Sequence, residues 1–247
     1  MKLCVTTVVD KKYVHYIPLF IYCLRYAYPE YKIKIFTLCD YPSHKFAEIV
    51  PNYFEGHRPG FNTIALRFLV PKKEFKNFDY VYITDIDMLI MREGRPLHTF
   101  HLQEMASTGL CYSNSTRNSK HWKGEESLSG LHFCAYEWFE KVEKEADRYR
   151  DYLLNTPERR EFDGHMLYNM CRNSGLGIPG KFKLIPRHHG IHLGNFRLFE
   201  KTRDLKKRIP MTFRFQWMRM RNNNNFLNMI RECNDPMVDK LDKFCGL

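Results

Sequence analysis

The sequence predicts an α/β fold in which helices flank a mostly parallel central sheet. Residues 3–9 are β-branched and apolar, which is typical of a buried parallel strand. Residues 32–38 have the same character. Residues 16–28 between them have the signals of a helix, with Pro18 in its first turn and Pro29 just after its end. Strand, helix and strand in this order form a βαβ unit, whose crossover is right-handed.

The next segments alternate in the same way. Ser43 is a candidate cap for a short helix that reaches Val50, and Asn62 for another that Pro71 ends. Residues 79–84 predict the next strand. We expect further strands near 106–112 and 130–134, and helices over 135–153 and 162–172.

The polar stretch 113–127 lies between two predicted strands. It is longer than an ordinary connection, and long loops in compact domains are often binding loops or lids. We therefore expect the acceptor of any reaction to enter under this segment.

The chain has 247 residues, which suits one α/β domain with a smaller C-terminal appendage. Its composition, 44% hydrophobic and 27% charged, excludes a disordered protein. From Arg197 onward the sequence becomes basic and rich in Phe and Met. We place the core domain over 1–200 and a basic helical extension, packed on that core, over 201–247.

The formal net charge is +11, which favours anionic partners such as nucleotides, nucleic acid, anionic glycans or a membrane surface. The basic residues are spread along the chain and form no motif of the common nucleic-acid modules, so no specific nucleic acid is expected. The basic aromatic segment 214–221 fits either a helix on an anionic membrane or a packed helix whose basic side chains face water, and the second is favoured. The eight cysteines form no C-x-x-C pair and are expected as reduced thiols.

The first residues lead directly into a strand, with no signal peptide ahead of it. No apolar run approaches the ~20 residues that a membrane helix needs. We therefore expect a cytoplasmic protein, with peripheral membrane association as an option.

The tripeptide Asp85-Ile-Asp87 directly follows the predicted strand 79–84. Ligands of open α/β sheets bind beyond the carboxyl ends of the strands. Two carboxylates spaced i and i+2 in a tight turn can approach one divalent cation, and Mn²⁺ or Mg²⁺ prefers such oxygen ligands. A cation at this place can neutralise the charge that develops on a nucleoside diphosphate leaving group.

Three histidines lie within the run 187–192, at His188, His189 and His192. Neutral imidazole suits Mn²⁺ better than Mg²⁺. We choose His192 as the third ligand because Gly194 follows it, and either of the other two histidines is the alternative.

Four stretches over roughly residues 3–200 resemble the GT-A glycosyltransferases, and most closely glycosyltransferase family 8. They are the opening strand with Asp10-Lys-Lys-Tyr13, Arg67-Phe-Leu-Val-Pro71, Tyr82-Ile-Thr-Asp-Ile-Asp87, and Ile191-His-Leu-Gly194 with Arg197. Four features depart from the family pattern. The spacing from His192 to Gly194 is one residue short, and Arg197 stands where a Lys is usual. Leu128-Ser-Gly130 stands in place of Asn-Ala-Gly, and Asp163-Gly164 in place of an Asp-Gln pair.

The resemblance implies a GT-A catalytic domain that transfers a hexose from a UDP-sugar to a glycan, lipid-linked or protein acceptor, with retention of configuration. It implies that His192 completes a metal site with Asp85 and Asp87. It also implies a nucleotide-sugar site formed by Thr7, Asp10, Tyr13, Arg67, Asp85 and Arg197. The departures leave the stereochemistry open.

Asp163 is the candidate catalytic residue, at the start of a predicted helix. In a retaining enzyme it would orient the donor sugar or stabilise an oxocarbenium-like state, and in an inverting enzyme it would act as general base. A helix-capping role would explain the same residue.

Three other functions compete with sugar transfer. A nucleotidyltransferase that makes sugar nucleotides usually has a Gly-rich loop after the first strand, and residues 10–13 contain no glycine. A basic nucleic-acid-binding protein and a non-catalytic GT-A scaffold are the remaining alternatives.

Overall fold

The structure is a computed structural model, and it describes residues 1–54, 63–118, 126–155, 163–180, 190–194 and 209–246. The chain forms two compact units, and each is assembled from segments that are distant in the sequence. The first unit comprises Met1–Lys11, Tyr31–Asp85 and His98–Arg187. The second comprises Lys12–Glu30, Ile86–Leu97 and His188–Leu247. The predicted boundary at residue 200 stays a prediction.

A six-stranded sheet of order β3-β2-β1-β4-β9-β6 forms the centre of the first unit. Its strands are β1 (Leu3–Val9), β2 (Lys32–Thr37), β3 (Glu48–Val50), β4 (Tyr80–Ile83), β6 (Tyr112–Ser113) and β9 (His132–Ala135). Three neighbouring pairs are parallel, and β9 runs in the opposite direction to the other five strands. The predicted α/β class with a mostly parallel central sheet and flanking helices is confirmed.

Strand β1 is central to this sheet, and all seven of its residues are buried. It pairs in parallel with β2 on one side and β4 on the other, which explains its continuous apolar sequence. Beyond β4 the Thr84 amide still donates to the Thr6 carbonyl, at 3.0 Å. The ladder therefore fixes the chain up to the residue that precedes Asp85.

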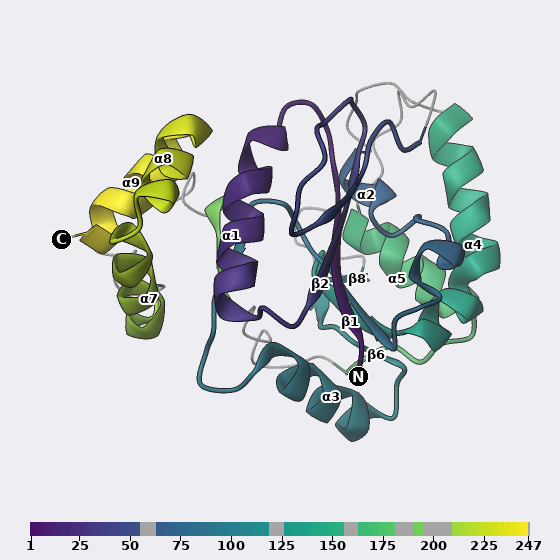
Figure 1. Cartoon of the computed structure of the whole chain (residues 1–247). Coiled ribbons are helices and arrows are strands. Elements are labelled where there is room, and N and C mark those ends of the chain that lie inside the picture. The colour runs from purple at the N-terminus through teal and green to yellow at the C-terminus, as the bar shows by residue number, and fades with distance from the viewer. Residues whose placement is uncertain (55–62, 119–125, 156–162, 181–189, 195–208, 247) are drawn as a thin grey trace. The chain divides into compact units, whose positions relative to one another are not determined.

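Helices of the first unit are α2 (Thr63–Leu66), α3 (Leu97–Thr108), α4 (Tyr136–Asn155) and α5 (Asp163–Asn173), with a 3-10 turn η2 (Lys72–Phe75). Figure 1 shows α4 and α5 side by side, and α4 also contacts η2 and β9. The fully buried Trp138 of α4 donates its indole N–H to the Cys171 sulfur of α5, at 3.4 Å. A shared apolar core therefore seats both helices against the sheet.

Two predicted elements are wrong. No helix spans 43–50, because residues 48–50 form the edge strand β3. There Glu48 supplies a carboxylate 2.9 Å from the buried Lys34 ammonium of β2, and this distant partner outweighs the capping signal of Ser43. The strand expected near 106–112 is wrong for all but its last residue, because α3 continues to Thr108, Gly109 with φ of 67° ends it, and strand β6 begins only at Tyr112.

Two other segments differ in part. The helix expected to reach Val70 is the single turn α2, which ends at Leu66. The polar stretch 113–127 contains two strands, β7 (Thr116–Asn118) and β8 (Glu126–Leu128), which pair in antiparallel fashion. Residues 119–125 lie outside the described residues.

The second unit contains α1 (Ile17–Ala27) with its preceding 3-10 turn η1 (Val14–Tyr16). A short antiparallel pair, β5 (Met88–Ile90) and β10 (Gly190–His192), and three C-terminal helices complete it, namely α7 (Met211–Arg221), α8 (Asn224–Cys233) and α9 (Pro236–Gly246). Helix α1 contacts both β5 and α8. Figure 1 shows α7, α8 and α9 in yellow-green to yellow, packed on one another.

Within the described part of the chain, no helix combines the length and apolarity required to cross a bilayer.

The C-terminal helices are joined to α1 through Phe226 of α8. This ring is fully buried, with its centroid 5.0 Å from that of Tyr22 in α1 and 5.1 Å from that of Trp217 in α7. We expect Phe226→Ala to lower the free energy of unfolding by about 3–5 kcal/mol, because it leaves a cavity at this junction.

Urea unfolding followed by tryptophan fluorescence measures this loss. The matched control is Phe215→Ala, since Phe215 of α7 is 59% exposed. Equal effects of the two substitutions would contradict the packing described for Phe226.

Candidate active site

The guanidinium of Arg67 contacts four other residues of the first unit. Its Nη1 lies 2.8 Å from Asp85 Oδ1, and its Nη2 lies 2.6 Å from Asp163 Oδ2. The guanidinium also donates to the Gly130 carbonyl, at 3.1 and 3.3 Å, and to the Ile64 carbonyl, at 3.0 Å. One cation therefore joins the acid that follows β4 to the acid that begins α5.

Burial explains why Arg67 needs so many partners. Its side chain is only 4% exposed, and a buried charge is costly unless it is paired and hydrogen-bonded. The planar guanidinium presents five N–H donors in a fixed fork, and the two carboxylates lie at different ends of it. Arg67 is therefore not an exposed residue with a surface ion pair.

The Gly130 turn must approach the guanidinium closely. A Cβ on Gly130 would lie 2.5 Å from Arg67 Nη2 and 3.1 Å from Asp163 Oδ2. The nearer distance is too short for real atoms, so a side chain here would displace the guanidinium. Gly130, which stands in the tripeptide that departs from the family pattern, is therefore required by the Arg67–Asp163 contact.

A buried polar network holds this turn in place. Asn114 accepts from the Ser129 amide at 2.8 Å and donates to the Ser129 carbonyl at 3.0 Å. The side-chain nitrogen of Asn114 also lies 3.0 Å from Nδ1 of His132. Burial lowers the pKa of His132 to about 3. A neutral His132 therefore accepts from Asn114 through Nδ1. This network was not predictable from the sequence, because its members are 15 and 18 positions apart in the chain.

Arg117 is a second basic residue near the two acids. It extends from β7, and its guanidinium donates to the Ser129 hydroxyl at 3.0 Å. Packing around the guanidinium lowers its pKa, whereas the charges of Asp163 and Asp85 raise it, and the net pKa is below its ordinary value. The role of Arg117 was not predictable from the sequence, because a single Arg in a polar stretch of a basic chain does not stand out.

Asp87 and His192 form an ion pair in the second unit. Their Oδ1 and Nε2 atoms are 3.0 Å apart, and the Gly194 amide donates to the other carboxylate oxygen at 3.1 Å. Burial raises the pKa of Asp87, but the hydrogen bonds from His192 and Gly194 lower it by more than burial raises it. The pKa of Asp87 is therefore below its ordinary value. The pairing of β10 with β5 sets this contact, because His192 stands opposite Met88 in the register.

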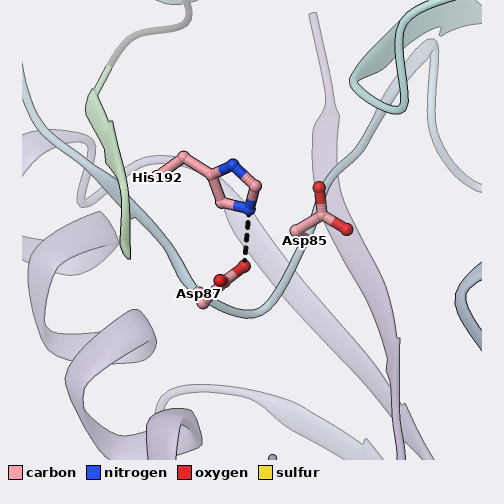
Figure 2. A group of neighbouring side chains, drawn as sticks. All are labelled: Asp85, Asp87 and His192. Atoms are coloured by element: carbon pink, nitrogen blue, oxygen red, sulfur yellow. Dashed lines mark ion pairs between the residues drawn. The ribbon is translucent and has the colours of Figure 1, made fainter. Parts of the chain in front are cut away.

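Asp85, Asp87 and His192 each offer one ligand atom, and the three atoms lie within 4.8 Å of one another (Figure 2). Two carboxylates and one imidazole fit the preferences of Mn²⁺. Gly194 leaves room for this group, since a Cβ there would lie 3.2 Å from Asp87 Oδ2 and 3.3 Å from His192 Nε2. The donor set and the small neighbour therefore fit a divalent cation. A cation on His192 would replace the proton of the ion pair.

The remaining predicted residues are placed as follows. Thr7 is buried within β1, and Asp10 is the first residue after that strand. Tyr13 precedes η1, with its ring 6.2 Å from that of Tyr16 and the Lys12 ammonium 5.2 Å from its centroid. His188, His189 and Arg197 lie outside the described residues, so their roles stay predictions.

No protein-family model matches the sequence, and no curated protein matches it significantly. Similar solved structures include the apo-form glycosyltransferase GlyE of Streptococcus pneumoniae TIGR4, with 15% identity and a TM-score of 0.44 over 70% of this chain and 44% of GlyE. The chain therefore spans less than half the length of GlyE.

Two further structures are similar to the same degree. The galactosyltransferase LgtC, in complex with donor and acceptor sugar analogs, has 15% identity and a TM-score of 0.42, over 68% of this chain and 69% of LgtC. Core-mannan synthase A of Aspergillus fumigatus, in its Mn/GDP form, has 11% identity and a TM-score of 0.42, over 69% of each chain. With TM-scores below 0.5, these likenesses decide nothing about the activity of this chain.

The close approach at residue 130 gives a direct test of the Arg67 cluster. We expect Gly130→Ala to lower the free energy of unfolding by about 1–3 kcal/mol, because the new methyl group displaces a guanidinium that is held by several partners. Thermal unfolding measures the loss. The matched control is Gly94→Ala, since a Cβ there would meet nothing within 4 Å. A Gly130→Ala protein as stable as the control would contradict the described contact.

Proposed function

We propose that this chain is a metal-dependent glycosyltransferase that transfers a hexose from a UDP-sugar to a glycan, lipid-linked or protein acceptor. The observation that carries the proposal is the double role of Asp85. It lies with Asp87 and His192 in a group that fits a divalent cation, and it is bound by the buried guanidinium that also holds Asp163.

The transfer breaks the bond between the anomeric carbon of the sugar and the diphosphate oxygen. A new bond forms to an acceptor oxygen, whose proton passes to the oxygen of the departing diphosphate. A bound Mn²⁺ or Mg²⁺ would neutralise the charge that develops on the departing UDP. Asp85, Asp87 and His192 would hold that cation.

Asp163 is the proposed catalytic residue. Its side chain is 16% exposed, and among the described residues Arg67 binds only one of its oxygens, Oδ2. Arg67 thus fixes the carboxylate and leaves an edge of it toward solvent. In the retaining reaction that we propose, this carboxylate orients the donor sugar and stabilises positive charge on the sugar ring.

The nucleotide contacts are inherited from the sequence resemblance. In this proposal Asp10 and Tyr13 bind the uracil end of the donor, with Thr7 beside them. Arg67 and Arg197 add positive charge near the diphosphate. The net charge of +11 favours the approach of such an anionic donor.

Calorimetric titration with UDP, GDP and CDP, each with and without Mn²⁺, tests the donor site. We expect UDP to bind only when Mn²⁺ is present. We expect Asp87→Ala to abolish this binding, because it removes one of three ligands and the partner of His192.

The matched control for this titration is Asp79→Ala. Asp79 is a 56% exposed acid that precedes β4 and accepts from the Lys2 amide. Binding of GDP or CDP alone would keep the site and change the base. If no nucleotide binds under any condition, or if Asp87→Ala binds as the wild type does, the proposed function is wrong.

Replacing Asp163 by Asn tests its catalytic role. Asn keeps the size and can still accept from Arg67, so UDP affinity should change by less than about threefold, while kcat falls by roughly 100-fold or more. Hydrolysis of the UDP-sugar, with water as acceptor, gives a rate without a known acceptor. The exposed acid Asp151 on α4 supplies the control, Asp151→Asn. An unchanged kcat would exclude Asp163 from catalysis, and a loss of UDP binding would assign it to the architecture of the site.

A further inference from the structure

Helix α7 has two apolar faces. Phe213, Trp217 and Met220 are buried in the second unit. Met211, Phe215 and Met218 are 58%, 59% and 46% exposed. Among the described residues, seven large hydrophobic side chains are exposed, and these are three of them. Their spacing of i, i+4 and i+7 aligns them in one stripe along the helix. We call these three residues the outer stripe.

The outer stripe belongs to a firmly held helix. The Trp217 indole N–H donates to Asp242 of α9, at 2.8 Å, and its ring is stacked with that of Phe213. The Gln216 side chain accepts from the Arg92 amide at 3.0 Å and donates to the Arg92 carbonyl at 2.6 Å. These contacts fix the rotation of α7, so the exposure of the stripe follows from the packing of the opposite face.

Basic side chains lie beside the outer stripe. Arg219 is exposed on one flank, and Arg214 and Arg221 stand on the other flank of the helical wheel. On that second flank the Arg214 guanidinium lies 5.1 Å from the Phe244 ring centroid, and Arg221 pairs with Asp242 at 3.1 Å. Helix α7 contains these three arginines and no acid, so it combines an exposed apolar stripe with a net positive charge, to which Arg219 contributes from an exposed position.

We propose that α7 docks the protein on an anionic lipid surface, with the outer stripe at the boundary between headgroups and acyl chains and Arg219 beside the lipid phosphates. Two other occupants explain less. Nucleic-acid phosphates would engage the arginines and leave the outer stripe in water. A second copy of the chain would bring like charges together around the stripe, which opposes association.

This docking goes beyond sugar transfer and does not rest on it. Asp87 and His192 belong to the same compact unit as α7. Docking of α7 would therefore keep the unit that carries these two residues at the membrane surface. An acceptor that is itself embedded in a bilayer fits such an arrangement.

Sedimentation of the full chain with vesicles tests the proposal. One vesicle type is phosphatidylcholine with about 30% phosphatidylglycerol, and the other is phosphatidylcholine only. We expect binding to the anionic vesicles and weakening of that binding by salt. Phe215→Ser should lower the partition coefficient roughly tenfold, since it removes a large apolar side chain from the docked face. Arg219→Glu should lower it by a similar factor.

Two substitutions in the first unit serve as matched controls. Phe46→Ser removes another aromatic side chain that is 49% exposed, and Arg148→Glu reverses a charge whose side chain is 77% exposed. Both should bind anionic vesicles as the wild type does.

Three results would overturn the docking proposal. The first is a failure of vesicle binding to depend on the outer stripe. The wild-type protein would then stay in solution with anionic vesicles, or the Phe215→Ser variant would bind them as well as the wild type does. The second is binding of a single-stranded oligonucleotide that displaces the vesicles and does not depend on Phe215. The third is a dimer in sedimentation velocity that Phe215→Ser dissociates, which would assign the outer stripe to self-association. None of these results concerns UDP binding, so the docking and the transferase proposals can fail separately.

Discussion

The first unit depends on the neutralisation of one buried cation. The Arg67 side chain is buried, and its guanidinium is paired with both Asp85 and Asp163. This pairing holds the turn after β4 against the start of α5. It also limits residue 130 to glycine, because a larger residue would occupy the space of the guanidinium. With one acid removed, the guanidinium would keep one carboxylate partner and lose the acceptor at its other end, so architecture and chemistry share the same atoms.

Much of the central sheet was predictable because its signals are local. The apolar runs of β1, β2 and β4, and the prolines that flank α1, are visible in short windows of sequence. The two acids after β4 were predictable for the same reason, since an apolar strand that ends in a D-x-D tripeptide places both at a strand terminus. Arg67 and Asp85 were both assigned to the nucleotide-sugar site through the family resemblance, and they lie 2.8 Å apart in the structure.

Elements defined by distant partners were not predictable. Strand β3 exists because its backbone pairs with β2 and because Glu48 meets the buried Lys34, neither of which Ser43 or its neighbours reveal. Arg67 touches Asp163 from 96 positions away. Asn114, His132 and Arg117 likewise acquire their roles only when β6, β7 and β9 are assembled. The choice of His192 over His188 and His189 came from the Gly194 that follows it together with the family resemblance.

The packing of α8 on α1 has a consequence for biosynthesis. Helix α1 is synthesised long before α8, yet the ring that packs on Tyr22 belongs to Phe226 of α8. Co-translational folding usually completes the earliest-made domain first. Here the second unit needs segments that are made far apart in time, so part of the apolar surface of α1 stays uncovered until α8 has been made. The nascent chain is thus a natural client for chaperones that shield such surfaces during this interval.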